Sequence, residues 1–192
     1  MSKRISNENR ILIMLAFFSV SLGLWGNFRQ LWLQNNGLEV GKISNILSLG
    51  TFLCVIGIII FSKKIKVNSL KTFISTALVL KAINLVGLFV IDNSNIMIFI
   101  RIFVMLDIIL EKLIIISIYP LIVTIKKDDN FYSKRKLTEY LFRDLGLLIG
   151  GILIGKVIAG VVVNYNICLL ISVVFLVFAF IFSNRNKSKR AN

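Results

Sequence analysis

Two carboxylates stand inside a long apolar run of this chain. Asp107 and Glu111 are spaced i,i+4 within the run 96–125, so they share one face of a helix. Two neighbouring carboxylates at membrane depth resist double ionisation, and one of them could bind and release a proton. We expect the pair to line a substrate or ion pathway. The alternative is a buried ion-pair network with Lys112, and with Lys81 if its helix lies close.

A second polar set follows the first apolar run. Projected at helical spacing, six small or polar residues fall on an arc of about 100°: Ser19, Gly23, Gly26, Asn27, Gln30 and Gln34. We expect Asn27, Gln30 and Gln34 to contribute, with the two carboxylates, to the wall of a water-filled cavity. Helix packing through interhelical hydrogen bonds is the alternative.

Arg29 lies on the other side of the same helix, with Trp25 and Trp32. All three are near the expected outer end of the first span. Indole rings prefer the membrane interface, and a long arginine side chain can reach it from within the span. We therefore expect Arg29 to snorkel outward and the two tryptophans to lie at the outer interface.

The fifth apolar run, 137–163, opens with charged residues. Glu139 and Arg143 are spaced i,i+4 in the favourable order, and Asp144 follows directly. They fall within about two turns of the expected cytoplasmic end of the helix. We expect a structural charge cluster here.

The same run is rich in glycine, and its glycines fall on two sides of the expected helix. One side carries Gly146, Gly150 and Gly160. The nearly opposite side carries Gly151 and Gly155. In lipid, small residues let helix backbones pack closely. We expect a close neighbour on each side, and thus a bundle that extends beyond the helices of this chain.

Composition sets the class of the protein. The chain is 57% hydrophobic, and its mean hydropathy is +0.86. Both values exceed those of soluble domains, so we expect an all-α integral membrane protein with six transmembrane helices. The expected spans are 11–33, 44–62, 70–91, 96–125, 137–163 and 165–183. Residues 1–10 form the expected cytoplasmic N-terminus, and 184–192 form a basic cytoplasmic tail.

The net charge of +14 is distributed unevenly. Lysine and arginine gather between the second and third spans, between the fourth and fifth, and in the tail. By the positive-inside rule, we expect a multi-pass protein of the cell membrane with both termini cytoplasmic. The basic segment 126–136 contains two aromatic residues but is too short for a nucleic-acid platform. We expect it to be a solvated, lipid-facing loop.

Several classes of function are disfavoured. The chain has no histidine, and Cys54 and Cys168 sit singly in apolar runs. Histidine bases, histidine metal sites and thiol-redox motifs are therefore not expected. No phosphate-binding loop and no nucleophile–base set is visible. We expect neither an enzyme, nor a metal or cofactor, nor a nucleic-acid partner.

Three stretches resemble the major facilitator superfamily of transporters. Arg101, which opens R-I-F-V-M, is similar to the arginine of that family's fourth-helix motif. The glycine run 146–155 resembles its fifth-helix motif without the proline. Gly50 and Gly57 precede the basic loop 62–71, where the family carries G-x-x-x-D-R/K-x-G-R-R/K. The loop has the cations of that motif but lacks its aspartate and glycine.

The resemblance implies the N-terminal six-helix half of a twelve-helix transporter, built as two inverted three-helix repeats. It places the first and fourth spans on a central cavity, and the second and fifth at the boundary with the other half. We therefore expect the chain to pair with a second six-helix half or with itself, or to be a fragment or a truncated gene product.

The expected function is half of a secondary active transporter that moves a small solute by alternating access. Proton coupling through Asp107 or Glu111 is one option. A first alternative is a six-span substrate-binding subunit of an energy-coupling-factor type importer. The first span has only Ala16 where such subunits carry an A-x-x-x-A docking face. A second alternative is a truncated transporter without activity.

Overall fold

The computed structural model describes residues 6–62, 69–91, 97–125, 129–158 and 165–184. Within these ranges the regular structure is entirely helical, which confirms the expected all-α class. The elements are α1 (Asn7–Ser21), the π-helical segment η1 (Leu22–Gly26), α2 (Arg29–Asn35), α3 (Val40–Ser62), α4 (Leu70–Ile91), α5 (Met97–Ile125), α6 (Asp129–Ile158) and α7 (Asn166–Asn184).

Among the described residues, four helical stretches are long and apolar enough to cross a membrane. They are Asn7–Asn35, which joins α1, η1 and α2, followed by Val40–Ile60, Leu70–Ile91 and Asn166–Asn184. The long helices α5 and α6 contain the charged residues of the expected fourth and fifth spans. The structure thus has the apolar helices of a membrane protein.

The N-terminus and the loop between the expected fourth and fifth spans differ in detail from the predicted layout. Helix α1 begins at Asn7, where the Ser6 side chain accepts a hydrogen bond from the Asn9 backbone N–H, so part of the expected N-terminal segment is helical. The expected loop 126–136 is also wrong in part, because α6 begins at Asp129. Residues 1–5, 126–128 and 185–192 lie outside the described ranges.

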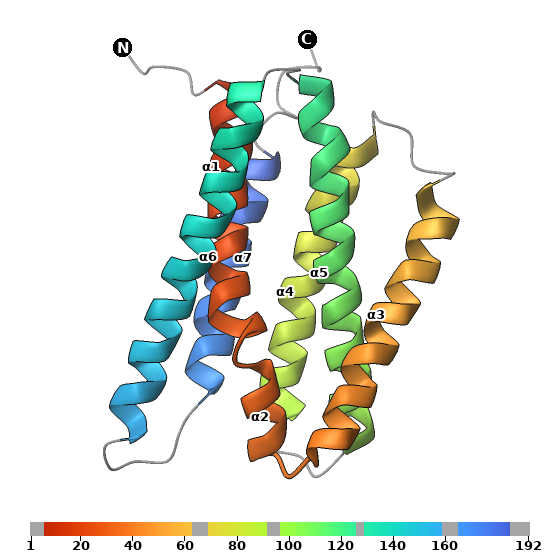
Figure 1. Ribbon diagram of the computed structural model, residues 1–192, viewed down its shortest axis with the longest axis vertical. Coiled ribbons are helices and arrows are strands. Elements are labelled where there is room, and N and C mark those ends of the chain that lie inside the picture. The colour runs from red at the N-terminus through yellow and green to blue at the C-terminus, as the bar shows by residue number, and fades with distance from the viewer. Residues whose placement is uncertain (1–5, 63–68, 92–96, 126–128, 159–164, 185–192) are drawn as a thin grey trace.

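The helices pack in a regular pattern. Helix α1 contacts α6 and α7, α5 contacts α3 and α4, and α4 packs against α7. Figure 1 shows α3 and α6 at opposite edges of the bundle, with α1 beginning and α7 ending at the same end. The second and fifth expected spans are therefore the least enclosed.

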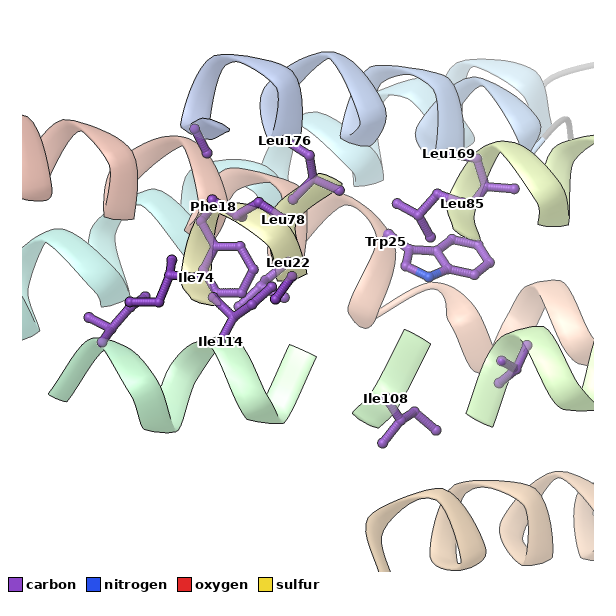
Figure 2. Close-up of a cluster of buried hydrophobic side chains, with 14 of the residues drawn as sticks. Phe18, Leu22, Trp25, Ile74, Leu78, Leu85, Ile108, Ile114, Leu169 and Leu176 are labelled. Atoms are coloured by element: carbon purple, nitrogen blue, oxygen red, sulfur yellow. The ribbon is translucent and has the colours of Figure 1, made fainter. Parts of the chain in front are cut away.

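The core lies between α1, α4, α5 and α7. Figure 2 shows Phe18, Leu78, Ile114 and Leu176 among the side chains that converge there. Each of these four is almost completely buried. Fully burying such a side chain is worth about 1.5–3 kcal/mol in water, but in lipid the contribution comes from dispersion contacts and tight packing.

A tight turn joins α2 to α3. Gly37 has a φ of 81°, a conformation that favours glycine. Its N–H donates to the Gln34 carbonyl at 2.9 Å, and the Leu38 N–H donates to the Leu33 carbonyl at 3.1 Å. This pair of bonds is a Schellman motif, which satisfies the last carbonyls of α2 and reverses the chain.

One glycine side of α6 packs against the first span. A Cβ on Gly146 would lie 3.0 Å from the Gly23 Cα, and a Cβ on Gly23 would lie 2.8 Å from the Leu147 backbone nitrogen. The backbones therefore touch where the two helices cross. Gly150 packs beneath the Phe28 ring, where a Cβ would lie 3.0 Å from one ring carbon. The expected close neighbour on this side is confirmed.

On the other glycine side of α6, Gly151 meets no neighbour in the described part of the chain. A Cβ on Gly151 would have no atom within 4 Å apart from its own helix. Gly155 belongs to α6, but its surroundings are not described, and Gly160 lies outside the described residues. The two sides of this helix thus differ in what they contact.

Candidate functional site

Four charged side chains meet inside the bundle, and we call them the central cluster: Arg29, Lys81, Asp107 and Glu111. The Arg29 Nη2 atom lies 2.6 Å from Glu111 Oε2 and 3.0 Å from Asp107 Oδ2. Lys81 forms an ion pair with Asp107 and lies 3.9 Å from Glu111 Oε2. Helices α2, α4 and α5 each contribute to the cluster.

The cluster is buried and electrically balanced. The side chains of Lys81 and Asp107 are 1% and 0% exposed, against 7% for Arg29 and 14% for Glu111. Two cations face two carboxylates, so every charge has a partner of opposite sign. This pairing offsets the large cost of removing charges from water. Glu111 is the most exposed member of the cluster.

Trp25 ties the π-helical segment to the cluster. Its indole Nε1 donates a hydrogen bond of 2.9 Å to Asp107 Oδ2. The Trp25 ring also meets Trp32 edge to face, with centroids 5.5 Å apart. A π-helical turn widens the helix by one residue and often occurs at functional sites. Here η1 contains Trp25 and leads directly into the segment that bears Arg29.

A further polar contact joins α4 to α5 beside the cluster. The Asn84 side chain donates a hydrogen bond of 2.9 Å from Nδ2 to the Phe103 carbonyl. Asn84 follows Lys81 at i,i+3, so both side chains leave α4 on one face. The two helices are thereby held together by the Lys81–Asp107 ion pair and the hydrogen bond of the Asn84 side chain.

The expectation that Arg29 snorkels outward is wrong, and the two tryptophans also face the bundle interior. All three are buried, with 6% of Arg29 and 1% of each tryptophan exposed. The helical projection grouped them correctly on one side, but this side faces the bundle interior. Two carboxylates on α5 attract the guanidinium inward more strongly than the interface attracts it outward.

The three amide residues of the first span differ from the carboxylates in exposure. Asn27, Gln30 and Gln34 are exposed in this chain, whereas Asp107 is fully buried. The expected stripe divides at η1, because Ser19 is buried before it and the three amides are exposed after it. They form a polar surface of their own.

Lys112 is not a member of the central cluster. It is exposed on α5, and Arg29 provides the second cation instead. The buried ion-pair network with Lys81, considered above as an alternative, is therefore present with a different partner. The structure places Asp107 and Glu111 together on one face, as their spacing indicated.

The expected charge cluster at the start of the fifth run also differs. Glu139 Oε2 lies 3.5 Å from Nη2 of Arg135, one turn earlier in α6, rather than pairing with Arg143. Arg143 and Asp144 are exposed. The reason is that aromatic rings hold Arg135 beside Glu139, whereas Arg143 lies on the next turn without such support.

Sequence reasoning missed Arg29 and Trp25 as members of the site. A usable signal was present, because two carboxylates inside an apolar helix require cations from elsewhere. Arg29 is one of the few cations that lie within an expected span. Its distance of 82 positions from Glu111 hides the pairing from any local pattern.

The geometry thus defines an all-helical bundle with membrane-length apolar helices and a buried, neutral charge cluster. No family model, no curated protein and no solved structure matches this chain. The resemblance to the major facilitator superfamily therefore stands on the motifs of the sequence. Arg101, which carries part of that resemblance, is exposed on α5.

Proposed function

We propose that this chain is half of a secondary active transporter, with six spans and both termini in the cytoplasm of the cell. It would move a small solute across the cell membrane by alternating access. The single observation that carries the proposal is the central cluster. Ionisable residues inside membrane bundles are costly and typically mark substrate or ion pathways.

The cluster has the properties of a coupling element. Its charges come from three helices, so a change in any one pairing alters how these helices attract one another. A proton taken up by Glu111 would release Arg29 from its 2.6 Å contact and leave Asp107 with both cations. A charged solute could compete for the same groups. Either event would favour a different arrangement of the helices.

The helix contacts support the proposed inverted repeats. Exchanging α1 with α5, α3 with α6 and α4 with α7 maps each major contact between these helices onto another. Contacts α1–α6 and α5–α3 are then equivalent, as are α1–α7 and α5–α4, while α4–α7 maps onto itself. Gly50 on α3 packs against Ile108 of α5, as Gly146 on α6 packs against α1.

The need for a second half rests on the edge helices. The Gly151 side of α6 is open, and Gly57 on α3 also has no neighbour for a Cβ within 4 Å in the described structure. In the proposed transporter these helices face the other half, which is a separate six-helix chain or a second copy of this one.

The test compares Glu111→Gln with Glu39→Gln. Glu39 is a matched control because its carboxylate pairs with Lys42 at the surface and is 74% exposed. Cells that express each form would be screened for uptake and tolerance across a panel of solutes, with membrane amounts measured in parallel. We expect Glu111→Gln to abolish the phenotype that the wild type confers, and Glu39→Gln to retain it.

Proteoliposomes then test the half-transporter arrangement. The chain would be reconstituted at a density of one monomer per vesicle, with and without a second half or a second copy. Solute movement by the isolated monomer would refute the proposal. Co-purification of an ATPase would instead favour the substrate-binding subunit, and equal behaviour of all variants would favour an inactive protein.

A further inference from the structure

A groove opens between the end of α5 and the start of α6, with a volume of about 610 Å³. It is lined by three tyrosines, two cations, Glu139 and a set of apolar side chains. The apolar part comes from Ile115, Ile116 and Pro120 of α5. The groove lies at the end of the bundle from which α1 begins (Figure 1).

Arg135 is the central residue of this α5–α6 groove. Its guanidinium carbon lies 5.6 Å from the centroid of the Tyr119 ring and 5.7 Å from that of Tyr132. The two rings meet edge to face, with centroids 5.8 Å apart. Cation–π contacts of this kind hold the guanidinium in place without neutralising its charge.

The charge of Arg135 is incompletely paired. Only 7% of the residue is exposed, yet its Nε atom has no hydrogen-bond partner among the described residues. Its carboxylate contact is Glu139 at 3.5 Å, which is long for a charge-assisted hydrogen bond. Lys136 adds a second cation, with Nζ 5.4 Å from the Tyr132 centroid. A preformed positive site therefore faces the groove.

We infer that the α5–α6 groove binds the phosphate headgroup of an anionic phospholipid. Arg135 and Lys136 hold the phosphate, and an acyl chain lies along Ile115 and Ile116. Phosphate oxygens match the fork of donors that a guanidinium presents. The basic residues around the groove suit the leaflet in which anionic lipids are enriched. Glu139 competes with the lipid for Arg135, so it limits affinity.

This inference does not depend on transport, and a direct binding measurement tests it. The full chain would be purified in a neutral detergent and titrated with phosphatidylglycerol or phosphatidylcholine, with bound lipid counted by native mass spectrometry. We expect a preference for phosphatidylglycerol. Arg135→Gln should reduce the affinity for this lipid about tenfold, and Lys136→Gln roughly fivefold. Glu139→Gln should increase it.

Lys134→Gln is the matched control, since Lys134 is exposed on the same turn and does not line the groove. It should keep the preference of the wild type. Equal lipid binding by the Arg135, Lys136 and Lys134 variants would overturn the inference. Displacement of the lipid by millimolar inorganic phosphate would overturn it too, because the site would then recognise a free anion. Lys136 is exposed, so its variant gives a result even if Arg135→Gln fails to fold.

Discussion

The central cluster and the α5–α6 groove both set an arginine against a glutamate and aromatic rings, but they are assembled differently. In the central cluster, Arg29 and Glu111 are 82 positions apart and approach to 2.6 Å. In the groove, Arg135 and Glu139 are one helical turn apart and remain at 3.5 Å. One pair joins distant segments tightly, and the other is local and loose.

The two regions differ in how far their charged groups remain hydrated. The members of the central cluster have lost water and replaced it with one another, so removing one leaves the buried cluster with an unbalanced charge. The groove is open to the surroundings at Lys136, which is exposed, although Arg135 itself is only 7% exposed. A closed charge cluster is suited to coupling helices, whereas an open one is suited to binding a ligand.

Asp107→Asn is expected to have the largest effect and tests whether the central cluster is closed. Asp107 contacts both cations, so its neutralisation leaves Lys81 and Arg29 with Glu111 alone. We expect the free energy of unfolding to fall by about 3–5 kcal/mol. Titration from a mild detergent into SDS, followed by circular dichroism, measures it. The double variant Asp107→Leu, Lys81→Met should recover part of the loss, and no loss in the single variant would contradict a closed cluster.

A second prediction tests the close contact between Gly146 of α6 and the first span by adding a larger side chain. Gly146→Val inserts carbon atoms where the backbone of α1 already lies, so we expect a loss of about 1–3 kcal/mol in the same titration. Gly151→Val on the next turn meets open space and should change stability by less than about 0.5 kcal/mol. Equal losses in the two variants would mean that the crossing at Gly23 is not formed.

The smallest effect is expected in the groove. Arg135→Gln removes two cation–π contacts at a partly open site, so we expect a loss of about 1 kcal/mol in the free energy of unfolding. Thermal unfolding in detergent would measure it against Glu39→Gln, which removes only a surface ion pair. A loss as large as that of Asp107→Asn would erase the distinction between the two regions.

Much of the architecture was predictable because it depends on local properties. The all-α class follows from long apolar runs, and the shared face of Asp107 and Glu111 follows from their spacing. The glycine contact of α6 was also foreseeable, since Gly146 and Gly150 fall on one side of the helix. Its partner was not, because Gly23 was assigned to a polar stripe.

The errors arose where two distant segments determine the outcome. The helical projection separated Arg29 from the amide stripe correctly, but it cannot say which side faces inward. The start of α6 at Asp129 was missed because the segment is polar, and helix formation there depends on burial of Phe131 and Arg135.

By itself, the sequence determined that this protein is a set of apolar helices with charged residues inside them, since length and periodicity act within each segment. Only the tertiary structure decided that the arginine side of the first span turns inward and the amide side outward. The physical reason is that the orientation of a helix depends on the charges it meets. Those charges lie on α4 and α5, far away in the chain.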